Sequence, residues 1–247
     1  SQPSLFGANN STSSGCLTEA MASELPKTLE YLHTRFDGSS SYGWSIVLQS
    51  PHVLLSLPRS LHTFDIFTSN PIQMQHRVTL PPESSSWLPR TLTCLGMPAS
   101  LISDPAWFSS LPLHLKTLKL FLGTLPMRFM HALAQRCRSL EFFQVMEAEK
   151  RNLDQLSQLG PELLLHLPRS LTALQFNVTN FYASSGRAPA PIVDASMLES
   201  LPPSLTSLII PLHFPDSLPP HLMASLPPRL HTVLPMGGFH IVDGNPS

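Results

Sequence analysis

A short pattern recurs along this chain and constrains the fold more than any other feature. Leu-Pro, two variable residues and Leu-x-x-Leu-x-Leu appear as "LPRSLHTFDI" from Leu57, "LPRSLTALQF" from Leu167 and "LPPSLTSLII" from Leu201. Eight copies are recognisable, at a mean spacing of about 29 residues, which is typical of solenoid repeats. One such unit cannot bury its own leucines, so successive units must stack. The eight anchoring leucines are Leu29, Leu61, Leu92, Leu115, Leu140, Leu171, Leu205 and Leu230.

A helical segment is predicted before each Leu-Pro. Seven residues upstream lies a helix-capping residue such as Ser50, Asp104 or Asp194, whose side chain can accept a bond from the first turn. In several copies a proline follows the cap, where its missing N–H costs nothing. The third, fourth and seventh positions are apolar and form one face of a helix of about two turns, which the proline of Leu-Pro ends. The Leu-x-x-Leu-x-Leu that follows predicts a strand with one buried face.

Two copies depart from this unit. The segment "PPESSSWL" at 81–88 has serines at the apolar positions, so we expect a loop there. The fifth copy lacks Leu-Pro, and "LPMRFMHALAQRC" at 125–137 predicts a longer helix in its place. The Gly/Ser-rich stretches 37–43 and 183–191 are interpreted as insertions after strands.

The predicted domain organisation has three parts. We expect a disordered N-terminal segment at 1–15, a repeat solenoid at 16–236, and a C-terminal tail or cap at 237–247. The chain opens without an initiator Met, so we expect its start to have been trimmed or the sequence to be a fragment.

Composition and charge exclude several classes of function. Charged residues make up 13% of the 247 residues, the net charge is −1, and no basic run interrupts the chain. A nucleic-acid partner requires a cationic stripe, and no nucleic-acid binding is therefore predicted. The three cysteines are far apart and form no metal-binding pair, and no stretch is apolar enough to span a bilayer. No metal or cofactor is expected.

The Leu-x-x-Leu-x-Leu core with its helical return resembles a leucine-rich repeat, in the variety that enters its strand through Leu-Pro. The resemblance covers about residues 17–236 and implies an α/β solenoid of about eight repeats. In this horseshoe, parallel strands line the concave face and short helices the convex face. The family's asparagine, expected three residues after the last strand leucine, is replaced here by Asp37, Ser69, Ser100, Gly123, Ala148, Thr179 and His213.

The resemblance also implies where a partner binds. In the family, the variable strand positions face the concave side and contact a protein or peptide ligand. Exposed aromatic groups flanked by polar residues are typical of binding hot spots. The candidate contact residues are Asp65, Phe67, Lys119, Phe121, Phe142, Gln144 and Met146. An alternative interpretation places the last of the three variable positions in each strand, and with it the large aromatics, in the core.

No catalytic motif is present, since the chain has no G-x-S-x-G, H-E-x-x-H or phosphate-binding loop. The favoured hypothesis is a non-catalytic interaction scaffold. One alternative is the substrate-recognition part of an F-box-type ubiquitin-ligase adaptor, and a weaker one is an enzyme with an unrecognised site. The glycosylation sequon at Asn177 falls on a predicted strand, which favours an intracellular, cytoplasmic protein.

Overall fold

The computed structural model describes residues 16–34, 47–66, 78–121, 127–147, 167–178, 198–210 and 224–235. The predictions for 1–15, 37–43, 183–191 and 237–247 lie outside these residues. Eight strands of one large sheet, two short strands that pair with each other, and short helices follow one another along the described chain. The strands are β1 (Cys16–Leu17), β2 (Tyr31–Thr34), β3 (Val47–Leu48), β4 (Thr63–Ile66), β5 (Cys94–Pro98), β6 (Thr117–Phe121), β7 (Phe142–Glu147), β8 (Ala173–Val178), β9 (Ser207–Ile210) and β10 (Thr232–Pro235). The helices are α1 (Glu19–Glu24), η1 (Pro51–Ser56), η3 (Pro82–Trp87), η4 (Ala99–Leu101), η5 (Pro105–Ser110) and α2 (Met127–Arg136).

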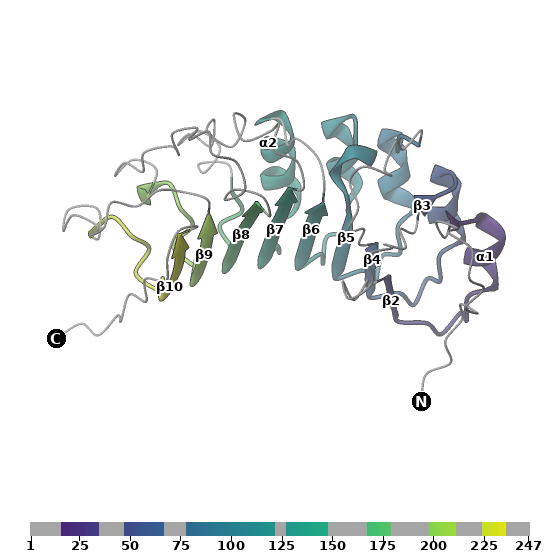
Figure 1. The fold of residues 1–247 in the computed structure, drawn as a ribbon, viewed down its shortest axis with the longest axis horizontal. Helices are drawn as coiled ribbons and strands as arrows, with labels where there is room; N and C mark the ends of the chain where they lie inside the picture. Colours follow the sequence, from purple (N-terminus) through teal and green to yellow (C-terminus); the bar gives the residue numbers. More distant parts are fainter. Residues whose placement is uncertain are drawn as a thin grey trace, which may run out of the picture.

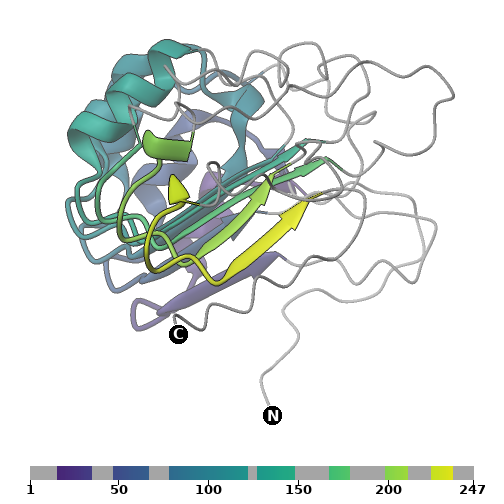
Figure 2. The same cartoon turned by 90° about the vertical axis from the view of Figure 1, so that its left-hand side faces the viewer.

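One open parallel sheet organises the molecule. Its eight strands follow the order β10-β9-β8-β7-β6-β5-β4-β2, and β1 and β3 pair separately in parallel. Each strand of the large sheet therefore lies beside the next one along the chain. Figure 1 shows the sheet bending into a shallow arc with the helices on its outer side, and the end-on view in Figure 2 shows the coils following one another along one axis. The predicted α/β solenoid-like arrangement of parallel strands and short helices is confirmed.

The core lies between the sheet and the helices. The anchoring leucines of the six inner coils, from Leu61 to Leu205, are 0% exposed, whereas Leu29 and Leu230 at the two ends are only partly buried. The alternate strand residues Phe64, Leu95, Leu118, Phe143, Leu174 and Leu208 continue this core. Because both ends are less buried than the middle, the leucines are covered by neighbouring coils, as expected of a stacked array.

Most of the outer helices are two turns of 3₁₀ helix rather than α-helix. Thr18 caps α1 by accepting a hydrogen bond from the Met21 N–H at 3.1 Å, and Asp104 caps η5 through Ala106 at 2.8 Å. Ser50 precedes η1 but makes no capping bond. The fifth coil has Cys137 where the others have proline, so its N–H donates to the carbonyl of Leu133 at 2.8 Å. That α-type bond is one a proline cannot make, and the predicted longer helix is confirmed as α2.

The prediction of a loop at 81–88 is wrong. These residues form η3, and Ser84 and Ser85 occupy its buried face at 0% and 1% exposure. Each hydroxyl donates to a backbone carbonyl three residues earlier, to Pro81 at 2.7 Å and to Pro82 at 3.2 Å. Ser84 also accepts a hydrogen bond from Nε1 of Trp107 in the next coil, at 3.0 Å. Small, satisfied serines therefore replace apolar groups here and leave space for the large indole.

All eight corners between helix and strand have the same geometry. The N–H of the anchoring leucine donates to the carbonyl three residues back, as from Leu61 to Pro58 at 3.2 Å. The two residues between them are called here the first and second turn residues. In five corners the second turn residue is a serine or threonine whose hydroxyl donates to carbonyls of the preceding corner. These hydroxyls belong to Ser60, Thr91, Ser139, Ser170 and Ser204.

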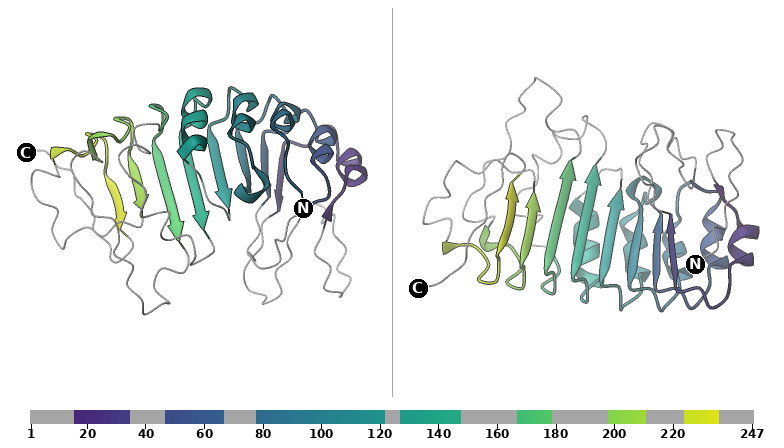
Figure 3. Two further views of the ribbon diagram at one scale, coloured as in Figure 1. Left: turned by 90° about the horizontal axis from the view of Figure 1, so that it is seen from above. Right: turned by 60° about the horizontal axis from the view of Figure 1, so that its bottom comes forward.

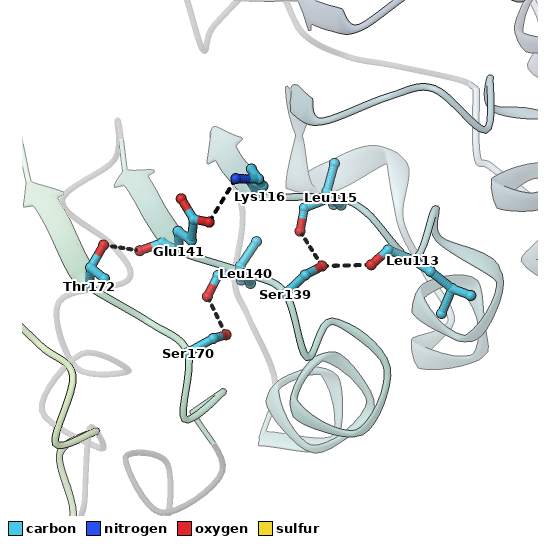
Figure 4. A network of polar contacts seen from close by, with 8 residues as sticks. All are labelled: Leu113, Leu115, Lys116, Ser139, Leu140, Glu141, Ser170 and Thr172. Carbon is cyan, nitrogen blue, oxygen red and sulfur yellow. Dashed lines mark hydrogen bonds and ion pairs between the residues drawn. The ribbon is translucent and has the colours of Figure 1, made fainter.

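These bonds form a hydroxyl ladder at the strand-entry end of the sheet. Figure 4 shows two of its rungs: Ser139 donates to Leu113 and Leu115 at 2.6 and 3.1 Å, and Ser170 donates to Leu140 at 2.6 Å. His114 interrupts the ladder in the fourth corner and Arg229 in the eighth. The hydroxyl ladder therefore ties successive coils together at the end where the strands begin.

Candidate functional site

The strand register brings the predicted contact residues onto neighbouring strands. Asp65 on β4 pairs with Gly96 on β5, which pairs with Lys119 on β6 and then Gln144 on β7. The row continues from Gln144 to Gln175 and Ile209. These residues alternate with the buried core residues of the same strands, so they face the concave side. The variable positions form columns across the sheet, as the sequence predicts.

An ion pair spans three strands at the centre of this face. Lys119 Nζ lies 3.0 Å from Asp65 Oδ2, although β5 separates the two residues. Strands are about 4.8 Å apart, so the lysine chain must cross β5, and Gly96 has no side chain to obstruct it. On the other side, His33 Nδ1 lies 3.7 Å from the same oxygen. Asp65 is therefore 7% exposed although it belongs to an open face.

A second polar pair lies next to the ion pair. Gln144 Nε2 donates to Gln175 Oε1 at 3.1 Å. A carboxamide has two donor hydrogens and two acceptor lone pairs, so the bonding among the described residues uses only part of the capacity of these two side chains. Phe142, half-buried on the same strand as Gln144, lies between Thr117 and Ala173 in the register. The aromatic ring therefore has small neighbours on both sides.

The structure places the seven predicted contact residues unequally. Asp65, Lys119, Phe142 and Gln144 lie together on the concave face of β4, β6 and β7. Phe121 and Met146 pair in the register at the ends of β6 and β7, but their side chains are outside the described part of the structure. Phe67 is also outside the described residues. Aligning the repeats puts His33, Gly96 and Gln175 in the same variable column as Asp65, but they were not among the predicted contact residues, because their roles depend on neighbouring strands.

The two described thiols are poorly suited to nucleophilic chemistry. Cys94 lies on the concave face, where burial raises its pKa; nearby Lys119 opposes this effect and Asp65 adds to it. Burial raises the pKa of Cys137 to about 12, against the opposing charge of Arg136. The thiolate is the reactive form of cysteine, so both groups are predominantly protonated thiols at neutral pH. Among the described residues, no cluster of three or more His, Cys, Asp or Glu side chains is arranged to hold a metal ion.

One charged feature was missed by sequence reasoning. The first turn residue is a cation in five of the first six corners: Lys27, Arg59, Arg90, Arg138 and Arg169. Roughly one repeat length of chain, about 29 residues, separates one corner from the next, so these cations do not appear as a basic run. Aligning the copies on their anchoring leucines would have shown the five cations in one column. We call these five residues, Lys27, Arg59, Arg90, Arg138 and Arg169, the cationic row.

Comparison with known proteins assigns no family to the chain. No protein-family model matches the chain, and no curated protein sequence is significantly similar to it. Within the described residues, no helix combines the length and the apolar character needed to cross a membrane.

Proposed function

We propose that this chain is a leucine-rich-repeat scaffold of about eight repeats that binds a protein or peptide on its concave sheet and performs no catalysis itself. The proposal is supported by the recurring Leu-Pro corner, the parallel sheet with one strand per coil, and the hydroxyl bonds that join the coils. Repeat arrays of this kind present long curved surfaces that suit the recognition of other macromolecules.

The arrangement of the concave face carries the proposal. Asp65 and Lys119 neutralise each other across Gly96, and Gln144 and Gln175 form a polar pair with unused hydrogen-bonding capacity. Phe142 adds an aromatic surface between small neighbours. Hot spots in protein interfaces combine such aromatic anchors with nearby polar groups. A partner that presents uncharged polar groups and an apolar side chain matches this face.

The test compares proteins captured by three variants of the chain. Phe142→Ser and Gln144→Ala change the concave face, and Glu83→Gln changes an exposed residue of η3 on the convex side as a matched control. The three variants are first compared with wild type by circular dichroism to establish equal folding. We expect a partner that wild type and the control retain and that both concave variants lose. Identical sets of captured proteins for all four chains would reject the concave face as the binding site.

A further inference from the structure

The cationic row lies along one edge of the sheet. The first turn residues of the corners are solvent-exposed, and the hydroxyl ladder fixes their order in space. Ser60 donates to the carbonyl of Lys27 at 2.7 Å, Thr91 to that of Arg59 at 2.8 Å, and Ser204 to that of Arg169 at 2.6 Å. The first turn residue of each corner therefore lies one coil away from the first turn residue of the next corner. Figure 3 (right) shows the corners aligned along the lower edge of the sheet.

This edge is strongly positive in a chain that is nearly neutral. We define the strand-entry edge as the two turn residues and the residue after the anchoring leucine in all eight corners. It contains seven Lys or Arg residues and two Glu residues, a net charge of +5, whereas the whole chain carries −1. The remaining residues therefore carry −6. Positive charge is therefore concentrated at the strand-entry edge.

The row's cations remain available for a ligand. Among the described residues, none of the five cations forms an ion pair. Glu141, an acidic residue of the same edge, pairs instead with Lys116 at 2.9 Å. Within the described part of the chain, the side chain of Arg59 is the one of the five with a protein hydrogen-bond partner, the carbonyl of Trp87 at 3.0 Å. With coils about 4.8 Å apart, the row extends for roughly 24 Å. Four of its members are arginines, whose planar guanidinium matches phosphate and carboxylate geometry.

The exposed apolar residue within the row indicates which anionic partner fits. Leu113 holds the first turn position between Arg90 and Arg138, and it is 55% exposed. An apolar side chain flanked by arginines is suited to a membrane surface, where the cations contact head groups and the apolar group enters the interface. Single-stranded nucleic acid is bound through aromatic stacking, and the strand-entry edge contains no Phe, Tyr or Trp.

We propose that the strand-entry edge binds the anionic head groups of a lipid surface, with Leu113 inserted between them. The proposal is independent of the partner bound on the concave face. Docking through this edge holds the solenoid on its side, so the concave sheet stands roughly perpendicular to the lipid surface and stays accessible. The attraction weakens with added salt, because the charges are exposed and screened by ions.

Vesicle sedimentation with the full chain tests this binding. The probes are vesicles of phosphatidylcholine alone and of equal parts phosphatidylcholine and phosphatidylserine. The edge variant is Arg90→Gln/Arg138→Gln. Its control, Ser86→Glu/Ser109→Glu, lowers the net charge by the same two units on exposed positions of η3 and η5. At roughly fivefold per cation, we expect the edge variant to bind phosphatidylserine vesicles about 25-fold more weakly, and the control to bind like wild type.

Two further measurements separate lipid from other polyanions. Leu113→Ala is expected to weaken vesicle binding several-fold at an ionic strength where the arginine contribution is already screened. A single-stranded oligonucleotide and poly-glutamate, both measured by fluorescence anisotropy, are expected to bind more weakly than vesicles and with no dependence on Leu113. The proposal is overturned if phosphatidylserine vesicles do not bind, if edge and control variants bind equally, or if either soluble polyanion binds more tightly than the vesicles.

Discussion

Replacing Ser84 with alanine tests how the buried serines of η3 stabilise the stack. Ser84 and Trp107 are both 0% exposed, and Trp107 Nε1 donates to Ser84 Oγ at 3.0 Å. Alanine removes the acceptor and leaves the indole N–H buried without it. An unsatisfied buried donor costs about 1–3 kcal/mol. The hydroxyl bond from Ser84 to the Pro81 carbonyl is lost as well, but that carbonyl still accepts the backbone N–H of residue 84 at 2.9 Å, so the indole N–H is the group left unsatisfied.

The adjacent Ser85 provides a matched control. It is similarly buried, and its hydroxyl donates to the Pro82 carbonyl at 3.2 Å. Unlike Ser84, it is not the acceptor of the hydrogen bond from the Trp107 indole. We expect Ser84→Ala to lower the free energy of unfolding by about 2 kcal/mol, or the melting temperature by roughly 4–8 °C for a chain of this size. Ser85→Ala should change the free energy by less than about 0.5 kcal/mol, as substitutions that leave no buried group unsatisfied usually do.

Urea unfolding followed by circular dichroism measures both variants, and a double-mutant cycle with Trp107→Phe isolates the bond. Phenylalanine has no N–H, so Ser84→Ala should cost little in that background, and the coupling energy should be about 1–2 kcal/mol. If Ser84→Ala and Ser85→Ala have the same midpoint and slope, the indole bond contributes nothing and the explanation of η3 is wrong.

Three other substitutions have defined outcomes. His114→Ser restores a rung of the hydroxyl ladder and should stabilise the fold by about 0.5–1.5 kcal/mol, seen as a higher urea midpoint; an unchanged midpoint would argue against the ladder. Lys119→Met removes the main cation from the nearly buried Asp65 and should lower the free energy of unfolding by roughly 2 kcal/mol, less than for a fully buried pair. Adding Asp65→Asn should recover part of this loss. A double variant with the same free energy of unfolding as Lys119→Met would contradict this explanation. Burial raises the pKa of Cys137 from 9.0 to about 12, so its thiol ionises first in the unfolded chain and stability should fall as pH rises from about 9 toward 12. That decline should be smaller in Cys137→Ala, and parallel curves of unfolding free energy against pH would show that the thiol does not contribute.

The fold was largely predictable because its determinants recur. Each Leu-Pro corner repeats the same turn and the same anchoring leucine. A wrong structural prediction from one copy is therefore corrected by the other copies. The column from Asp65 to Lys119 and Gln144 follows from the alignment of copies, and the strand register pairs these residues in the same order. Periodic hydrophobicity and turn chemistry agree in all but the third and fifth copies, and such agreement is the condition under which local sequence specifies a fold.

The differences arise where a residue's environment comes from another coil. Ser84 is unsuited to a helix core by its own chemistry, and only Trp107 in the next coil explains its burial. The ion pair between Asp65 and Lys119 depends on the missing side chain of Gly96, on the strand between them. The cationic row required the same kind of comparison, since each cation is unremarkable in its own repeat.

The hydroxyl ladder also bears on how such a chain can change in length. In each of the five joints of the ladder, a hydroxyl from one corner donates to a carbonyl of the corner before it, so each of these units carries both halves of the connection. Duplication or loss of one whole unit therefore recreates a complete joint at the new boundary, provided that the adjoining unit supplies a serine or threonine. His114 and Arg229 mark places where that condition fails, so recombination between genes should be tolerated less well immediately before the fourth and eighth units than elsewhere.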